Sequence, residues 1–208
     1  MTTRIKICGI TNRADAEKAA EMGASAIGFV FADSPRRIKP PVAREISQAL
    51  PPFISKIGVF VNEDISTIKE LYEYCRLDAV QLHGDEHIEY IKSLTVPFIK
   101  AFKVNGKEVI RRIEEFGLRY FLLDTFDKNL SGGTGKSFNW QIANRASRFG
   151  KIILSGGLNP DNIREALEIV NPYAVDISSG VEKSPGLKDY QKMETLINKV
   201  QLWDNRIN

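Results

Sequence analysis

The chain has 208 residues, of which 43% are hydrophobic and 26% are charged, the composition of one ordinary folded domain. A net charge of +3, without a stripe of basic and aromatic residues, argues against nucleic acid as a partner. The two cysteines form no disulfide framework or metal-ligand spacing, and no apolar signal segment or membrane-length run is present. We therefore expect a single cytoplasmic domain over residues 1–208 with no membrane partner.

The first apolar run starts at Arg4 and alternates isoleucines with other residues, which is the period of a strand. Gly9 stops the run, and Thr11 and Asn12 offer side-chain oxygens that can cap a helix. Cys8 therefore lies where a strand ends and a loop begins. A thiol in that place is either a small buried hydrophobe or a reactive group that faces an opening.

Strand-like and helix-like segments alternate along the rest of the chain. The expected strands are 4–8, 26–31, 57–61, 79–83, 98–102, 120–124, 152–155 and 173–178. The expected helices are 13–22, 41–50, 65–76, 88–94, 109–116, 139–149, 160–170 and 187–203. Eight such units in strict alternation predict an α/β protein with parallel strands, the single-domain (β/α)8 TIM barrel.

An open doubly wound sheet is the alternative fold. That fold usually has fewer strands and places a glycine-rich loop after its first strand. Here the glycine-rich stretches follow strands six, seven and eight instead, which favours the closed barrel.

Polar and reactive side chains gather at the carboxyl ends of the expected strands, where barrels of this type carry their chemistry. Packing alone does not predict such a collection on one rim. In chain order the ends carry Cys8, Arg36–Arg37, Asn62, His83, Asp124, Ser155–Gly157 and Ser178–Gly180.

Two glycine-rich turns follow strands seven and eight and predict a phosphate site. Glycine lets the backbone approach a ligand closely and aim successive N–H groups at an anion. The residues expected to bind phosphate are Gly156, Gly157, Ser179 and Gly180, with amides added by a helix starting at Pro160. The alternative is that both glycine pairs only make tight turns.

Cys8 and Asp124 are the two reactive groups expected to face each other across the barrel mouth. We expect the apolar strand before Asp124 to raise its pKa, and the phosphate site and Lys6 to ease ionisation of the thiol. The pair then reads as a thiolate base and a carboxylic acid. For Asp124 the alternative is a helix cap or a loop ion pair. Because strands one and eight are neighbours in a closed barrel, Lys6 and Asp176 should pair inside it.

Nine short motifs are spread along the chain: KICGIT at 6–11, GFVF at 28–31, SPRR at 34–37, GVFVN at 58–62, VQLHG at 80–84, LLDT at 122–125, GGTGKSF at 132–138, LSGGLNP at 154–160 and VDISSGVE at 175–182. KICGIT and VDISSGVE together are highly specific. With these motifs the chain resembles the phosphoribosylanthranilate isomerases of tryptophan biosynthesis along its whole length.

The resemblance implies an Amadori rearrangement of N-(5-phosphoribosyl)anthranilate into a 1-deoxyribulose phosphate. It assigns the base to Cys8 and the acid to Asp124, in agreement with the pairing reached from the residues. The reaction involves no redox change, so no cofactor and no metal are expected. The expected partner is the small phosphorylated substrate, and the sequence leaves open whether the protein is a monomer or a homodimer.

Three further residues are candidates for substrate binding. Arg36 suits the anthranilate carboxylate, because a guanidinium can donate two parallel hydrogen bonds. The alternatives are that Arg36 is a solvated loop residue or that Arg37 binds the carboxylate in its place. His83 either binds substrate or is a satisfied histidine of the rim. Asp176 shares a strand face with Ser178 and is the third candidate. The glycine-rich stretch 131–137 is a candidate lid or a plain loop.

Two rival functions remain at this stage. The histidine-pathway isomerase performs the same rearrangement on another amine, but that family uses an aspartate base where this chain has Cys8. A non-catalytic barrel that only binds a phosphorylated ligand is the other rival. The presence of both Cys8 and Asp124 argues against it.

Overall fold

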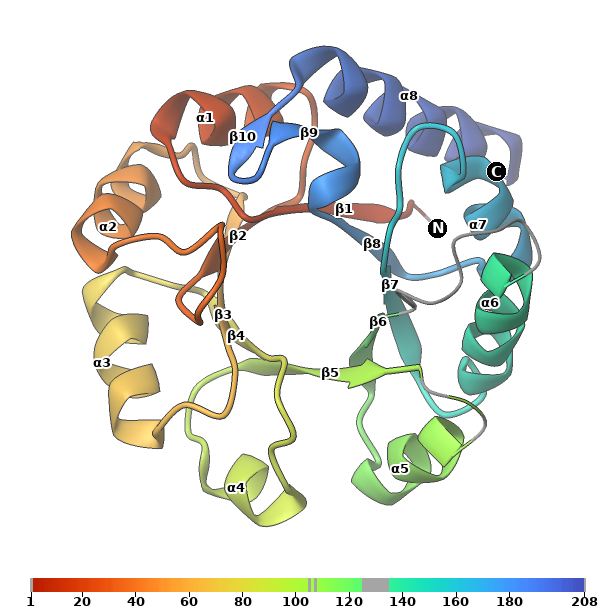
Figure 1. Ribbon diagram of the computed structural model, residues 1–208, viewed down its shortest axis with the longest axis horizontal. Helices are drawn as coiled ribbons and strands as arrows, with labels where there is room; N and C mark the ends of the chain where they lie inside the picture. The colour runs from red at the N-terminus through yellow and green to blue at the C-terminus, as the bar shows by residue number, and fades with distance from the viewer. Residues whose placement is uncertain (1, 105, 107, 125–134, 208) are drawn as a thin grey trace.

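The computed structural model describes residues 2–104, 106, 108–124 and 135–207. Its centre is a closed barrel of eight parallel strands in chain order, ringed by helices (Figure 1), so the predicted (β/α)8 barrel is confirmed. The barrel strands are Arg4–Cys8 (β1), Ala26–Val30 (β2), Ser55–Phe60 (β3), Ala79–Leu82 (β4), Phe98–Lys103 (β5), Tyr120–Asp124 (β6), Lys151–Ser155 (β7) and Ala174–Ile177 (β8).

The helices follow the strands as the alternation predicts. They are Arg13–Glu21 (α1), Pro40–Ala49 (α2), Ile65–Tyr74 (α3), Ile88–Ser93 (α4), Glu108–Phe116 (α5), Gly135–Ala146 (α6), Ile163–Val170 (α7) and Tyr190–Ile207 (α8). A 3-10 turn, Ser179–Val181 (η1), and a two-stranded hairpin, Glu182–Ser184 (β9) and Leu187–Lys188 (β10), lie between β8 and α8.

The alternation in β1 decides which of its side chains face the barrel interior. Ile5 and Ile7 belong to the main apolar core, which also holds buried helix residues such as Ala16. Lys6 and Cys8 alternate with them and so point inward. Further round the barrel, a separate apolar cluster comes from β5 to β8: Ala101, Leu122, Ile153 and Ala174. The interior is thus apolar where these four residues meet and polar around Lys6, Cys8 and Asp176.

Three helix starts differ from the sequence prediction by three residues or more. Helix α6 begins at Gly135 rather than Asn139, and α7 begins at Ile163 rather than Pro160. Before α7, the side chain of Asn159 accepts the backbone N–H groups of Asp161 and Asn162, so a capped turn replaces the first helical turn.

The segment expected to begin the last helix at Leu187 is instead strand β10, and α8 starts at Tyr190. The reason is tertiary. The backbone N–H of Lys188 donates to Asp15 Oδ2 at 2.8 Å, and its side chain is buried beneath the barrel rim. These contacts hold the residue in extended backbone and outweigh the helical pattern of its apolar neighbours.

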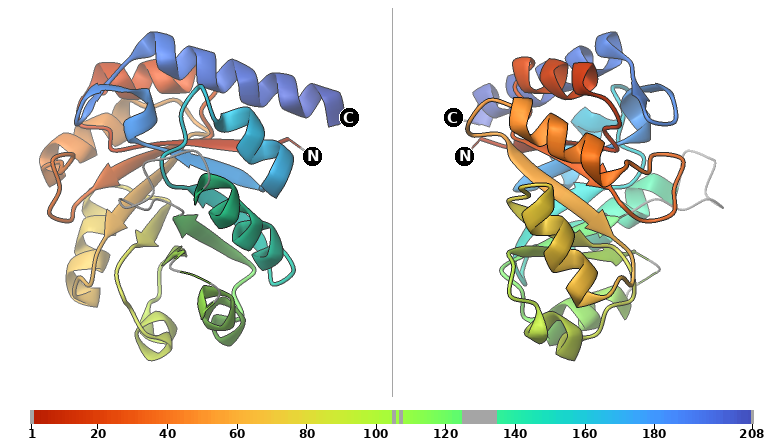
Figure 2. Two further views of the ribbon diagram at one scale, coloured as in Figure 1. Left: turned by 45° about the vertical axis from the view of Figure 1, so that its right-hand side comes forward. Right: turned by 90° about the vertical axis from the view of Figure 1, so that its left-hand side faces the viewer.

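Both ends of the chain lie on one side of the barrel (Figure 2), and they are tied together. The backbone N–H and the hydroxyl of Thr3 each donate to the Asp204 carboxylate at 2.8 Å. In the described part of the chain, no helix is both long and apolar enough to cross a membrane.

Candidate active site

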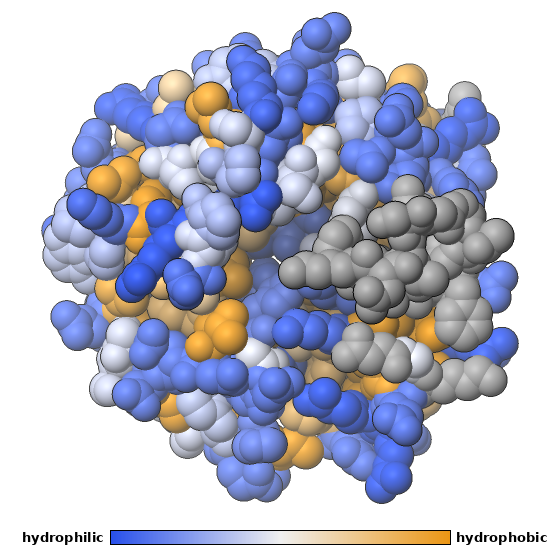
Figure 3. Space-filling view, viewed as in Figure 1, coloured by the Kyte–Doolittle hydropathy of each residue, from blue (hydrophilic) through white to orange (hydrophobic). Residues whose placement is uncertain are grey.

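A cavity of about 560 Å³ opens at the carboxyl ends of the strands. The space-filling view down the barrel shows a hollow near the centre of this face with hydrophilic residues around it (Figure 3). Of the nine site residues predicted from the sequence, the cavity is lined by Cys8, Arg36, His83, Asp124, Gly156, Gly157, Asp176 and Ser179. Gly180 is the exception, because it lines a neighbouring surface pocket together with Ser179.

Cys8 ends β1 beside a buried ion pair. Lys6 Nζ and Asp176 Oδ1 lie 2.8 Å apart, and both side chains are almost fully buried, so the pairing predicted from strand order is confirmed. Gly28 on the neighbouring strand makes room for this group. A Cβ added to Gly28 would lie 2.7 Å from Cys8 Sγ and 3.0 Å from Lys6 Nζ. Glycine at this place therefore lets the ammonium and the thiol share one small space.

The charge state of the thiol differs from the expectation. Burial raises the pKa of Cys8, and the carboxylate of Asp176 raises it further, while Lys6 acts in the opposite direction. Burial is the largest of these effects, so the net shift is upward rather than downward. In the protein without ligand the thiol is therefore harder to ionise than an ordinary cysteine, and the prediction of easier ionisation is wrong for this state.

Asp124 ends β6 on the other side of the cavity and contacts a histidine. His83 Nε2 lies 3.2 Å from Asp124 Oδ2, and His83 Nδ1 lies 2.8 Å from Nε2 of Gln81. Gln81 and His83 are two residues apart at the end of β4, so both face the barrel interior. The three side chains form a chain of contacts that runs from β4 to β6.

Arg36 comes from the loop after β2 and is held by a carboxylate. Its Nε lies 2.9 and 3.1 Å from Glu182 Oε1 and Oε2, and its Nη2 lies 2.7 Å from Oε2. This bidentate pair uses one edge of the guanidinium. Burial alone would raise the pKa of Glu182, but hydrogen bonds from Arg36 and Lys188 outweigh it and hold the pKa below its usual value.

Lys188 joins the arginine pair to the strand ends. Its fully buried Nζ donates to Glu182 Oε1 at 2.9 Å and to the carbonyl oxygens of Cys8 and Ser178 at 2.6 and 3.2 Å. One ammonium thus fixes the carboxyl ends of β1 and β8 relative to the carboxylate that orients Arg36.

The two glycine-rich turns lie against each other at one end of the cavity. Gly156 and Gly157 have φ of 99° and 68°, which only glycine adopts easily. A Cβ on Gly180 would overlap the carbonyl group of Leu158, so the second turn needs glycine for space. Within the described residues, no protein acceptor receives the backbone N–H groups of Gly157, Ser179 or Gly180.

The sequence predicts that the start of α7 adds backbone amides to the phosphate site. The backbone N–H groups of Asp161, Asn162 and Ile163 are satisfied by the side chain and carbonyl of Asn159. These three amides are therefore not available to an anion in the cavity. The next two N–H groups of α7, on Arg164 and Glu165, have no acceptor among the described residues, so the contribution of this helix to the phosphate site stays a prediction.

The sequence matches the family model for N-(5'-phosphoribosyl)anthranilate (PRA) isomerase over residues 5–199. The chain belongs to the N-(5'-phosphoribosyl)anthranilate isomerase family. A relative of that name from Geobacter metallireducens is 49% identical over 199 residues, which cover 95% of this chain and 98% of the relative.

Solved structures of the isomerase family agree with this chain along almost its whole length. Phosphoribosyl anthranilate isomerase from Thermotoga maritima has a TM-score of 0.90 and 43% identity, over 96% of this chain and 99% of that one. A second structure of phosphoribosyl anthranilate isomerase holds reduced 1-(o-carboxyphenylamino)-1-deoxyribulose 5-phosphate. It has a TM-score of 0.87 and 42% identity, with the same coverage.

For this member of the isomerase family, the sequence left three residues without a role that contact the cavity lining: Gln81, Glu182 and Lys188. Gln81 stood in the VQLHG motif, two positions before His83, and its strand face was the signal that could have found it. Glu182 ended the VDISSGVE motif without an assigned role, and Lys188 fell in a predicted helix. The candidate lid at 131–137 lies outside the described residues for most of its length. No group of three or more His, Cys, Asp or Glu side chains in the described ranges is arranged to hold a metal ion.

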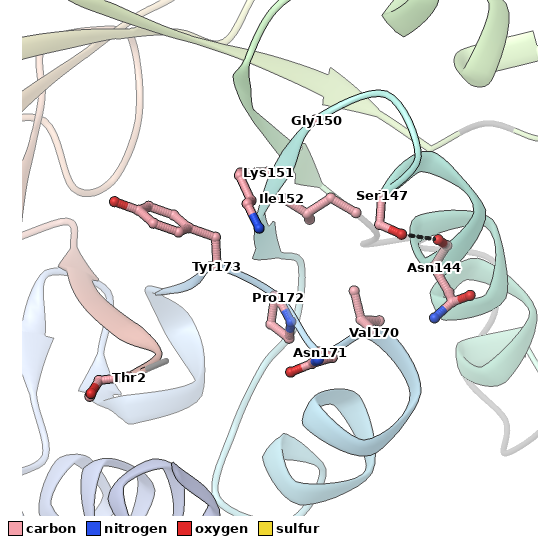
Figure 4. Close-up of a pocket in the computed structure, with 10 residues that line it drawn as sticks. All are labelled: Thr2, Asn144, Ser147, Gly150, Lys151, Ile152, Val170, Asn171, Pro172 and Tyr173. Atoms are coloured by element: carbon pink, nitrogen blue, oxygen red, sulfur yellow. Dashed lines mark hydrogen bonds between the residues drawn. The ribbon is translucent and has the colours of Figure 1, made fainter. Parts of the chain in front are cut away.

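A second cavity, of about 360 Å³, lies at the opposite, amino-terminal end of the barrel (Figure 4). It is lined by the end of α6, the start of β7 and the loop from α7 to β8. There, Ser147 Oγ donates to the carbonyl oxygen of Asn144 at 2.6 Å. Its ionisable lining residues are Lys151 and Tyr173, and no carboxylate, histidine or cysteine lines it.

Proposed function

We propose that this isomerase uses Cys8 and Asp124 as base and acid to convert N-(5'-phosphoribosyl)anthranilate into 1-(2-carboxyphenylamino)-1-deoxyribulose 5-phosphate, a step of tryptophan biosynthesis. The observation that carries the assignment is that both side chains line one cavity from opposite strands, β1 and β6. The reaction needs an acid and a base within reach of one sugar, and the shared cavity supports the choice of these two.

The chemistry follows from this placement. Asp124 protonates the furanose ring oxygen, the bond from that oxygen to C1 breaks, and the nitrogen lone pair forms the C=N bond of a Schiff base. The Cys8 thiolate then removes the C2 proton, and the electron pair of that C–H bond forms the enolamine. Tautomerisation, with a proton added at C1 and the enol proton lost, gives the ketone.

Lys6 supports the base in this scheme. Its ammonium faces both the Asp176 carboxylate and the Cys8 thiol. A positive charge beside the sulfur favours the thiolate that the second step requires, against the cost of burial.

The substrate's two anionic ends find partners at separate parts of the cavity. The Nη1 side of Arg36, which the Glu182 pair leaves unused, suits the anthranilate carboxylate. The backbone N–H groups of Gly157 and Ser179 suit the phosphate, with Gly156 and Gly180 as the glycines that shape the two turns. Asp176, with one oxygen on Lys6, lines the cavity where the sugar lies.

The assignment is tested by Cys8→Ala and Asp124→Asn. Each change should lower kcat by about 10³-fold or more, because each removes a group that acts in proton transfer. Turnover is followed by the fluorescence change as substrate is consumed. Binding of reduced 1-(o-carboxyphenylamino)-1-deoxyribulose 5-phosphate is the control and should change little. Near-normal turnover in either variant would overturn the assignment.

We further propose that the protein is a homodimer, in a cytoplasmic setting. Phe53, in the loop between α2 and β3, is 99% exposed with φ of 72°. A phenyl ring held in solvent by a left-handed backbone fits a surface that a second copy covers. A Thermotoga maritima structure, 40% identical to this chain, is named as monomers generated from a dimeric phosphoribosylanthranilate isomerase.

A further inference from the structure

Gln81 carries a buried polar atom that the fold leaves unsatisfied. The side chain lies on β4, is 1% exposed and lines the active-site cavity. Its Nε2 contacts His83 Nδ1 at 2.8 Å, but within the described part of the chain its Oε1 has no hydrogen-bond partner. Buried polar atoms are nearly always paired, so an unpaired acceptor beside a cavity points to a donor on the ligand.

The orientation of the amide follows from the same contacts. In the structure Nε2 of the amide lies 2.8 Å from His83 Nδ1, and Oε1 is the atom left without a donor. Nε2 is therefore the atom that faces His83, and it can only donate, so His83 Nδ1 accepts.

This contact determines the tautomer of His83. A neutral imidazole whose Nδ1 accepts a hydrogen bond carries its proton on Nε2. Nε2 is the ring atom that lies 3.2 Å from Asp124 Oδ2. His83 thus donates to that oxygen and orients the carboxyl group.

We propose that Gln81 is a positioning residue of the isomerase reaction: it holds His83 in the Nε2–H tautomer that orients Asp124, and its Oε1 accepts a hydrogen bond from a substrate N–H or O–H group. The kinetic consequence of this role rests on the proposed function. The tautomer does not, because it depends only on contacts within the protein. Of the two roles considered for His83, substrate binding or a satisfied histidine of the rim, the proposal chooses the second, with Asp124 as its partner.

The tautomer is tested by NMR on protein labelled with ¹⁵N in its histidine rings. The chain has two histidines, so His87→Gln leaves His83 as the single signal and serves as the background for all variants. At alkaline pH, where imidazole is neutral, two-bond couplings should show the proton on Nε2. In Gln81→Glu a carboxylate accepts from Nδ1–H, so the pattern should change to Nδ1–H or to a doubly protonated ring. An Nδ1–H ring in the unchanged protein, or the same pattern in Gln81→Glu, would overturn the proposal.

Kinetics separate the two roles of the amide. Gln81→Met removes both the donor to His83 and the acceptor for substrate, so kcat should fall by about tenfold or more and KM should rise. Gln81→Glu keeps an acceptor oxygen but reverses the tautomer, so kcat should fall with a smaller rise in KM. Unchanged kcat in both variants would contradict the positioning role. An equal rise in KM in both would contradict the acceptor role.

A failure of the proposed function would look different. In that case Cys8→Ala and Asp124→Asn would leave turnover near normal, while the NMR pattern of His83 would still follow Gln81. Inorganic phosphate binding, which involves the far end of the cavity, checks that each variant is folded.

Discussion

At the scale of single residues, the site sets opposing demands on the Cys8 thiol. Burial disfavours the thiolate, and Lys6 favours it from the same small space that Gly28 leaves open. Lys6 is in turn held by Asp176, so the ammonium stays charged although it is buried: their attraction outweighs burial and raises the pKa of Lys6. The base is thus adjusted by an ion pair that need not touch the substrate.

The raised pKa of Cys8 predicts how its alkylation depends on pH. A pKa above the ordinary value means that the thiolate fraction at neutral pH is small and grows about tenfold per pH unit until the pKa is reached. The rate of reaction with iodoacetamide should therefore keep rising beyond pH 8.5 in ligand-free protein. The measurement uses a Cys75→Ala background, although burial already raises the pKa of Cys75 to about 11. A rate that levels off near pH 7 would contradict the prediction.

The role of Lys6 is tested in the same assay. Lys6→Met alone leaves Asp176 buried without its partner, at a cost of about 3–5 kcal/mol in stability. The double variant Lys6→Met with Asp176→Asn removes both charges and is the sound comparison. Lys6 lowers the pKa of the thiol and Asp176 raises it. The alkylation rate should therefore be highest in the unchanged protein, lower in the double variant and lowest in Lys6→Met.

At the scale of elements, the loops after β7 and β8 act as one unit. The Gly180 backbone lies so close to Leu158 that no side chain fits between the two turns. The proposed phosphate end of the cavity therefore depends on how these two loops pack, and Asn159 already accepts the backbone N–H groups of Asp161 and Asn162 before α7.

Gly180→Ala tests this packing. The added Cβ would meet the Leu158 carbonyl carbon at 2.8 Å and Asn159 Cβ at 2.9 Å, so one loop must shift. We expect KM to rise by about tenfold or more and inorganic phosphate to compete less well, with a smaller change in kcat. Gly117→Ala is the control for lost stability, because its φ of 58° strains an alanine while the added Cβ meets nothing within 4 Å. Equal KM and phosphate inhibition in the two variants would remove the proposed phosphate site.

At the scale of the whole molecule, the two ends of the barrel have different uses. The carboxyl end holds the cavity with Cys8 and Asp124, whereas the loop with Phe53 lies at the other end, just before β3. A second copy that covered Phe53 would leave the active site open to substrate. Dimerisation is therefore expected to affect stability more than turnover.

Phe53→Ser tests the dimer. If Phe53 is a central contact, the variant should become monomeric in light scattering at micromolar concentration and should unfold at a lower temperature, since its Tm loses the contribution of association. Its kcat should stay near that of the unchanged protein. Val42→Ser, which changes a side chain that is 37% exposed in the first turn of α2, near the carboxyl end of the barrel, is the matched control. A monomer in the unchanged protein would exclude the proposal.

The order of strands and helices was determined by the sequence alone. Period and composition are local properties, and eight repetitions of one unit leave few ways to close a sheet. The same argument predicted that Lys6 and Asp176 pair, because strand order makes β1 and β8 neighbours, and the structure confirms it. Eight of the nine predicted site residues line the cavity for the same reason: strand ends converge on one rim.

The tertiary structure alone decided what each of these groups contacts. Glu182 on Arg36, Lys188 across the ends of β1 and β8, and Gln81 behind His83 all depend on distances between side chains from different elements. The upward shift in the pKa of Cys8 likewise depends on how deeply the thiol is buried. Local sequence carries the period of an element, whereas contacts, burial and charge environment arise only when distant segments meet in space.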